Sequence, residues 1–144
     1  MSRKSEGTSF EEIAKEIISE RKGVTLQKGV PVLVGVTTKK KHKFDLGNID
    51  EKILVECKHH SWTATGNSPS AKMTIWNEAM LYFLLTPKDF TNILFVKNSI
   101  CDQKRESLAD YYFRTYSHLI PENVEIWEYN PETEEIKIHI NTLE

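Results

Sequence analysis

Apolar residues recur every three or four positions near the start of the chain, which predicts a helix over about residues 9–21. The stripe consists of Phe10, Ile13, Ala14, Ile17 and Ile18. Ser9 and Glu12 have the spacing of a capping box, as do Thr8 and Glu11, and Gly23 supplies a stop signal. We therefore expect an amphipathic helix with one face on a core.

Short apolar runs separated by turn residues predict strands along the rest of the chain. The predicted strands are Val24–Gln27 and Val30–Val36 (one bent strand or two short ones), Phe44–Leu46, Ile53–Val55, Ile93–Val96, Val124–Tyr129 and Glu135–Ile140. Residues 47–52 offer a hairpin turn between the third and fourth runs, and Asn130 to Thr133 offers another near the end. The continuous run at 93–96 is typical of a central strand that is covered on both faces. In the last strand, isoleucines alternate with polar residues, and its outer face is acidic.

Two further helices are predicted, over Ser70–Leu85 and over Lys104–Leu119. The former ends before Pro87 and is apolar almost all round, so it is buried on both sides or covered by a partner subunit. The residues left over on its far side are Met73, Met80, Leu81 and Leu84, which a second subunit would cover, or in part the third helix and the terminal hairpin. Helices and strands thus alternate, which predicts an α/β fold.

Composition places the chain among ordinary globular proteins, with 144 residues, 28% charged and 39% apolar. We expect one domain over residues 1–144. No run approaches membrane-spanning length, and the charged N-terminus lacks the pattern of a signal peptide. Cys57 and Cys101 have no metal-type spacing and are expected to be reduced thiols. These features favour a cytoplasmic protein without a membrane partner.

The candidate chemistry lies at Asp45 and at the triplet Glu56-Cys57-Lys58. Side chains alternate along a strand, so Glu56, Lys58 and His60 share one face, and the hairpin would set Asp45 beside Glu56. Two carboxylates suit Mg²⁺, and a lysine can orient or deprotonate an attacking water. The alternative is a set of solvated surface charges, but the triplet ends a strongly apolar strand.

Asp45 followed by Glu56-x-Lys58 resembles the signature of the PD-(D/E)XK, or restriction-endonuclease-like, nuclease superfamily. The stretch from Gly7 to Glu11 is similar to the Gly…Glu helix start of small resolvase-like and Mrr-like members. The residue before the aspartate is Phe44 rather than proline. The resemblance covers roughly residues 7–97. It implies a restriction-endonuclease-like αβββαβ core, in which helices flank a central mixed β-sheet, followed here by a helix and a β-hairpin.

The resemblance also implies roles for individual residues. Asp45 and Glu56 would hold Mg²⁺ or Mn²⁺, with the Cys57 carbonyl as a further ligand, and Lys58 would position or activate the hydrolytic water. Supporting members would be Glu11 and Lys72, together with His60.

Helix geometry bears separately on two of these supporting residues. At about 100° per residue, Glu11 lies at the edge of the apolar stripe, within reach of a site at the sheet. Its alternative role is to favour the helix N-terminus through the dipole. Lys72 falls in the apolar stripe of the second helix, where it requires an anion, unless its stem extends to solvent.

Charge is divided unevenly, although the net charge is only −2. Residues 1–72 carry 13 Lys and Arg against 9 Asp and Glu, whereas residues 73–144 carry 6 against 12. The densest basic cluster comprises Lys39, Lys40, Lys41 and Lys43, with His42 among them. It could follow a phosphate backbone or form a solvated strand end or loop. Trp62 could stack on a base or wedge a duplex, or it could anchor its loop to the domain.

Together these features predict a metal-dependent DNA endonuclease. The alternatives are a catalytically silent DNA-binding or structural module of the same fold, and an RNA-processing nuclease. Without a separate reader domain, the chain is expected to recognise DNA structure, to work as a homodimer, or to rely on a larger protein partner for specificity.

Overall fold

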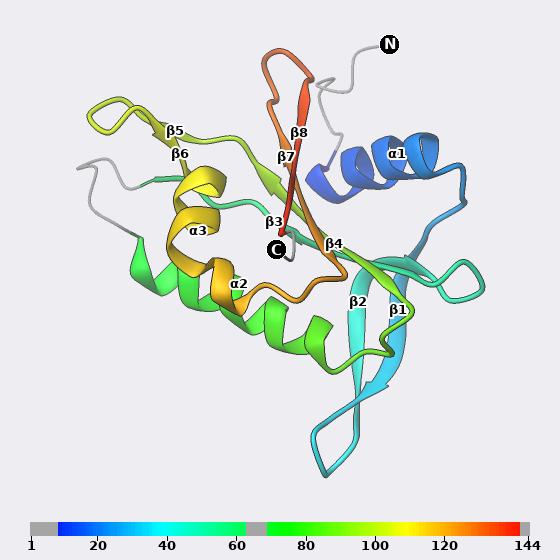
Figure 1. Ribbon diagram of the computed structural model, residues 1–144. Helices are drawn as coiled ribbons and strands as arrows, with labels where there is room; N and C mark the ends of the chain where they lie inside the picture. Colours follow the sequence, from blue (N-terminus) through cyan, green and yellow to red (C-terminus); the bar gives the residue numbers. More distant parts are fainter. Residues whose placement is uncertain (1–8, 63–68, 142–144) are drawn as a thin grey trace.

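A mixed six-stranded sheet forms the centre of the structure, a computed structural model that describes residues 9–62 and 69–141 (Figure 1). The strands, in spatial order, are β1 (Gln27–Val34), β2 (Lys40–Asn48), β3 (Ile53–Lys58), β4 (Thr91–Lys97), β7 (Val124–Tyr129) and β8 (Ile136–Ile140). β3, β4 and β7 run parallel, whereas β1–β2, β2–β3 and β7–β8 are antiparallel. The predicted α/β class and the order of helix, three strands, helix and strand are confirmed.

Helices cover both faces of this sheet (Figure 1). They are α1 (Phe10–Lys22), α2 (Ser70–Leu84) and α3 (Leu108–Tyr116), with a 3-10 turn η1 (Ser117–Leu119) after α3 and a small hairpin of β5 (Ile100–Cys101) and β6 (Glu106–Ser107) before it. α1 lies on one face, and α2 and α3 lie on the other. In the described part of the chain, none of these helices combines the length and apolar character that a membrane span needs.

The ends of α1 follow from local sequence. The Ser9 hydroxyl accepts the backbone N–H of Glu12 at 3.0 Å, as the capping box requires. Gly23 ends the helix in the left-handed region, with φ at 68°, and its N–H bonds the Ser19 carbonyl. The predicted helix is confirmed to within a residue at each end.

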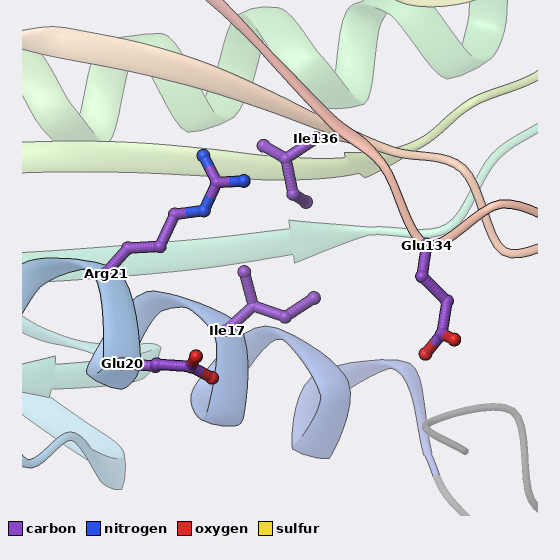
Figure 2. Close-up of a pocket in the computed structure, with 5 residues that line it drawn as sticks. All are labelled: Ile17, Glu20, Arg21, Glu134 and Ile136. Atoms are coloured by element: carbon purple, nitrogen blue, oxygen red, sulfur yellow. The ribbon is translucent and has the colours of Figure 1, made fainter.

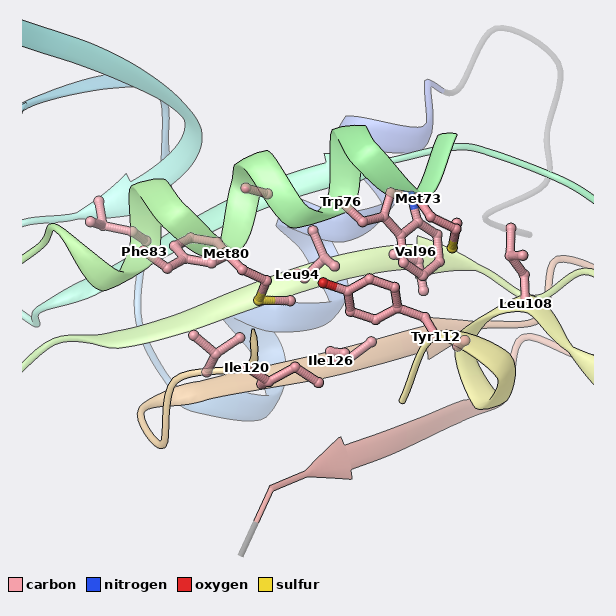
Figure 3. Packing of buried hydrophobic residues seen from close by; sticks show 14 of the residues in the cluster. Met73, Trp76, Met80, Phe83, Leu94, Val96, Leu108, Tyr112, Ile120 and Ile126 are labelled. Carbon is pink, nitrogen blue, oxygen red and sulfur yellow. The ribbon is translucent and has the colours of Figure 1, made fainter. Parts of the chain in front are cut away.

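The core has two parts, one on each face of the sheet. The part under α2 and α3 is shown in Figure 3 and contains Met73, Trp76, Met80 and Phe83 of α2, Leu94 and Val96 of β4, and Tyr112 of α3. The part under α1 contains Ile13, Ile17 and Ile18 of α1 with Ile93 and Phe95 of β4. Alternate residues of β4 therefore enter both parts, which confirms the central, doubly covered strand expected for residues 93–96.

β1 and β2 continue beyond the sheet as a two-stranded ribbon. β2 pairs with β3 only over residues 46–48, but it pairs with β1 from Gln27↔Gly47 to Val34↔Lys40. The tip of this ribbon projects away from the rest of the molecule (Figure 1). Gly29, at φ 63°, marks where the ribbon turns. On the sheet side of Gly29, Leu46 packs in the α1 part of the core. On the side of the ribbon tip, Phe44 packs in the α2 part.

The ribbon settles one alternative left open by sequence, because β1 is one strand that bends at a glycine. Lys40, Lys41 and Lys43 belong to β2, and their contact with a phosphate backbone stays a prediction.

Two expectations about the second half were wrong or incomplete. The third helix begins at Leu108 rather than Lys104, because residues 100–107 form the β5–β6 hairpin. Met73 and Met80 are 0% and 2% exposed rather than left over, because α3 and β7 cover them, as Figure 3 shows. Leu81 and Leu84 are exposed, as expected.

β8 also departs from the simple alternating pattern. Its Ile136 packs beside α1, but Ile138 and Ile140 remain exposed. The polar residue between them, His139, is the buried one. The apolar and polar residues of β8 therefore alternate as predicted, but most of its apolar face is exposed.

Candidate functional site

Asp45 lies where β2 and β3 separate. The pairing between β2 and β3 ends at Leu46↔Val55, so the next residues beyond it are Asp45 on β2 and Glu56 on β3. Asp45 Oδ2 accepts the backbone N–H of Cys57 at 2.8 Å. A side-chain carboxylate thus satisfies a main-chain donor of the neighbouring strand, which holds Asp45 against the Glu56-Cys57-Lys58 segment.

Glu56 is a buried carboxyl group with a second acid, Asp45, and one ammonium, that of Lys58, beside it. It is 5% exposed, and its Oε2 lies 4.0 Å from Lys58 Nζ. Burial raises the pKa of Glu56 to about 8, and the adjacent Asp45 adds to this rise through its charge and a hydrogen bond. Lys58 opposes the rise, and Glu11 contributes to it. The structure therefore brings together three predicted residues, Asp45, Glu56 and Lys58, with Glu11 close enough to act by its charge.

His42 is a member of this cluster that sequence analysis did not single out. Its Nε2 lies 2.8 Å from Glu56 Oε1. The ring stacks on Tyr82 of α2, with centroids 3.7 Å apart, and meets the edge of Phe44 at 4.6 Å. Burial, and then the charge of Lys58, lower the pKa of His42. One signal was available: His42 is two positions before buried Phe44, so it shares the inward face of β2 while its lysine neighbours do not.

Cys57 faces away from Glu56, as the alternation predicted. Its side chain packs beside the α1 part of the core. Burial raises the pKa of the Cys57 thiol, and the charges of Asp45, Glu11 and Glu56 raise it further. The thiol is therefore protonated and is a poor metal ligand, which leaves the backbone carbonyl as the donor that Cys57 can offer.

His60 and Lys72 lie beside each other at the margin of the site. His60 Nδ1 accepts the indole N–H of Trp76 at 3.0 Å, so the neutral ring carries its proton on Nε2. Burial lowers the pKa of His60, followed by the charges of Lys72, Lys58 and His59. Lys72 Nζ donates to the Ser61 carbonyl at 3.2 Å, and it is not among the charges that shift the pKa of Glu56.

Trp62 anchors the chain after β3, which was the alternative to base stacking. It is 8% exposed, and its indole N–H donates to the Glu106 carbonyl at 3.0 Å. Its backbone N–H donates to Ser99 Oγ, and its ring meets the edge of Tyr111. A ring buried in this way has little face left for a base. The polar loop at 63–68 and Gly7 lie outside the described residues.

The basic cluster lines a groove next to His42. The groove has a volume of about 390 Å³ and lies between the ribbon and the C-terminal end of α2, lined in part by Val34, Lys40, His42, Tyr82 and Leu85. Lys39 Nζ donates to the Gly35 carbonyl at 2.8 Å, a hydrogen bond that spans the turn at the ribbon tip. Within residues 9–62 and 69–141, no carboxylate is within ion-pair distance of Lys40, Lys41 or Lys43.

A second group of potential metal ligands, Asp110, Glu128 and His139, lies beneath α3. His139 Nε2 is 3.0 Å from Glu128 Oε1, while Nδ1 is 3.7 Å from Asp110 Oδ1. Asn98 donates to the other Glu128 oxygen, and Lys137 donates to Asp110. The imidazole thus lies between two carboxylates, and each carboxylate also accepts a hydrogen bond from another side chain.

A small pocket lies between α1 and the β7–β8 turn (Figure 2). Its volume is about 150 Å³, and it is lined by Ile17, Glu20, Arg21, Glu134 and Ile136. Figure 2 shows Ile17 and Ile136 facing each other, with the charged side chains around them. None of the candidate site residues lines it.

The cluster of Asp45, Glu56, Lys58 and His42 is therefore the candidate site. Its residues come from β2 and β3, and Tyr82 of α2 supports it. No protein-family model matches the chain, and comparisons with curated proteins and with solved structures find no match either.

Proposed function

We propose that this chain is a metal-dependent DNA endonuclease of the restriction-endonuclease-like type. The observation that carries the proposal is the meeting of two carboxylates and a lysine where β2 and β3 part. Asp45 is held there by the Cys57 amide, and Glu56 is buried beside it with Lys58 Nζ at 4.0 Å. Clusters of carboxylates with perturbed pKa values are typical of functional sites.

The order of elements supports the proposal. α1, β1, β2, β3, α2 and β4 follow one another in the order of the αβββαβ core, and β4 runs parallel to β3. Glu56 lies near the C-terminal end of β3 and Lys58 follows it two positions later on that strand, whereas Asp45 comes from the neighbouring β2. This placement agrees with the order of motif residues in the superfamily that the sequence resembles.

The donor set fits a divalent cation. Asp45, Glu56 and the Cys57 carbonyl are hard oxygen donors of the kind that Mg²⁺ and Mn²⁺ take. Burial and the adjacent Asp45 raise the pKa of Glu56 to about 8, and a divalent cation bound between the two groups would favour the ionised form of both. Bound there, Mg²⁺ or Mn²⁺ would polarise the phosphodiester and lower the pKa of a coordinated water.

The remaining residues have roles that follow from their positions. Lys58 is placed to orient the attacking water or to balance charge on the scissile phosphate. Glu11 adds negative charge from the first turn of α1. His42 fixes one oxygen of Glu56 through the 2.8 Å contact, and thereby sets the direction of the other. Lys72 and His60 flank the site and could contact a neighbouring phosphate.

A second candidate function is favoured by the same contact. Because Glu56 is 5% exposed and already engaged by His42, the site could be a satisfied structural cluster in a DNA-binding module without catalysis. The RNA-processing alternative shares the same site chemistry, so only the substrate distinguishes it.

Cleavage assays test the proposal directly. Labelled duplex, single-stranded and branched DNA, and RNA of the same sequence, are incubated with the wild-type chain in Mg²⁺, Mn²⁺ or EDTA. We expect cleavage of DNA that EDTA abolishes and that Asp45→Asn and Glu56→Gln remove. Asp50→Asn and Glu51→Gln, in the exposed turn between β2 and β3, are matched controls and should remain active. Full cleavage activity in Asp45→Asn and Glu56→Gln would reject the nuclease site. DNA binding by the wild-type chain without cleavage would favour the silent module.

A further inference from the structure

The ribbon formed by Val30–Val34 and Lys40–Phe44 has two different faces. On the inner face, Val30 is 6% exposed, Val34 4% and Phe44 0%, and His42 stacks on Tyr82 of α2. This packing fixes the orientation of the ribbon relative to the candidate site. A two-stranded ribbon alone is marginally stable in water, so contact with α2 is what makes it a rigid arm.

The outer face is exposed and combines lysines with apolar residues. It consists of two cross-strand pairs, Pro31↔Lys43 and Leu33↔Lys41. Leu33 is 59% exposed, and Val36 at the tip is 82% exposed. Apolar side chains this open on a projecting hairpin have no partner within the described chain to cover them.

The charge of this segment has a single sign. From Val24 to Phe44 the sequence holds five lysines and no acidic residue, in a chain whose net charge is −2. Lys41 and Lys43 are two residues apart on one strand, so they stand about 7 Å apart on the same face. Such a row attracts a polyanion and would repel a basic partner.

The dimensions of the ribbon suit a groove of duplex DNA. Its strands are about 5 Å apart, and Val30 to Val34 extends about 14 Å. The major groove is about 12 Å wide and 8.5 Å deep, and it admits a two-stranded β-ribbon. That groove also displays thymine methyl groups, which accept contact from apolar side chains such as Leu33. The same strand leads from the arm to Asp45, so a duplex seated on the arm has its backbone near the site.

We infer that the outer face of the β1–β2 ribbon docks in the major groove of duplex DNA, with Lys41 and Lys43 on phosphates and Leu33 and Val36 on base edges. The inference rests on the proposed function, because it specifies duplex DNA as the substrate of the proposed nuclease site. It assigns recognition to a surface that contains neither the carboxylates nor Lys58.

Binding in EDTA separates this inference from catalysis. Fluorescence anisotropy with a short labelled duplex compares the wild-type chain, Lys41→Glu, Lys43→Glu and the matched exposed control Lys88→Glu. Each arm variant should weaken binding by about tenfold and lower the slope of log affinity against log salt by about 1, whereas Lys88→Glu should change affinity by less than about threefold. Thermal unfolding of each variant checks that the fold is kept. Equal effects of the arm and control variants would overturn the inference.

A base substitution tests the groove. A duplex rich in A·T pairs is compared with one in which uracil replaces thymine, which removes only the major-groove methyl groups. The wild-type chain should bind the uracil duplex more weakly by about threefold, and Leu33→Ser should bind both alike. Equal wild-type binding to both duplexes, or to single strands, would reject major-groove docking.

The two proposals can fail separately. If the wild-type chain cuts DNA in Mg²⁺ and the arm variants bind and cut as Lys88→Glu does, the arm inference falls and the nuclease stands. If nothing is cut but the arm variants lose duplex affinity, the nuclease falls and the arm stands.

Discussion

The His42 imidazole lies 2.8 Å from the Glu56 carboxylate while its ring stacks on Tyr82, so a helix on one face of the sheet sets the orientation of a carboxylate at a strand end. The site thus depends on α2 as well as on the β2–β3 hairpin. His42 belongs to the basic cluster by sequence and to the carboxylate pair by structure. It therefore links the arm to the site.

Replacing His42 should impair metal binding more than folding. His42→Ala removes the partner of Glu56 Oε1, so the carboxylate can turn away from Asp45, and Mg²⁺ affinity should fall by about tenfold. His42→Gln retains a hydrogen-bond donor and should recover part of the loss. Isothermal titration with Mg²⁺ or Mn²⁺ measures both. Unchanged affinity in His42→Ala would show that Glu56 does not need this contact.

The contribution of Glu56 to the stability of the metal-free protein should fall as pH rises. Burial raises the pKa of Glu56 from 4.5 to about 8, so the folded state holds a proton that the unfolded state has lost over this interval. The stabilising contribution is full below about pH 4.5 and disappears as pH passes the folded-state pKa near 8. The slope in between is at most about 1.4 kcal/mol per pH unit, because one proton is involved.

Calorimetry in EDTA from about pH 5 to about pH 9 tests this prediction. Glu56→Gln should flatten the profile, whereas Glu51→Gln, in an exposed turn, should not. A wild-type profile as flat as that of Glu56→Gln would mean that Glu56 is ionised throughout.

Lys58→Ala should separate catalysis from binding. If Lys58 serves the water or the transition state, turnover should fall by about a hundredfold, while DNA affinity in EDTA changes by less than about threefold. Lys88→Ala is a matched control, because Lys88 is exposed and distant in sequence from the site. A collapse of affinity with unchanged turnover at saturation would make Lys58 a phosphate contact only.

The parts of the fold that could be predicted were those fixed by neighbouring residues. α1 was predicted because Ser9, Glu12 and Gly23 act within one turn of the helix ends. The meeting of Asp45 with Glu56 was predicted because a hairpin register relates the two strands. The start of α3 was missed because contacts distant in sequence hold residues 100–107 as the β5–β6 hairpin. The Glu106 carbonyl accepts the indole N–H of Trp62, and the Leu108 N–H donates to the Ser99 carbonyl.

The parts that could not be predicted involve residues distant in sequence. The role of His42 depends on Tyr82, which no periodicity within β2 reveals. Exposure of Ile138 and Ile140 depends on how far α1 extends across the sheet. Burial of Met73 and Met80 depends on α3 and β7. In each case the local pattern was correct, and the covering element decided the outcome.

Self-association is expected through the exposed apolar side of α2. Leu81 is 53% exposed and Leu84 47%, and Leu84 adjoins Leu119 of η1 around an apolar groove of about 220 Å³. A symmetric dimer would cover this surface with itself and would supply two sites for the two strands of a duplex. The basic arm contacts α2 through Tyr82, which is about 100° around the helix from Leu81, so the outer face of the arm would remain available to DNA.

Light scattering at micromolar concentration tests the assembly. The wild-type chain should have twice the 16.7 kDa chain mass, and Leu81→Lys should be monomeric because a desolvated ammonium at the interface has no partner. Ile138→Lys places the same charge on an exposed apolar position of β8 and should stay dimeric. A wild-type mass near 16.7 kDa, with and without DNA, would rule out the dimer while leaving the nuclease chemistry of one chain intact. A dimer broken by Ile138→Lys and not by Leu81→Lys would move the interface from α2 to the sheet edge.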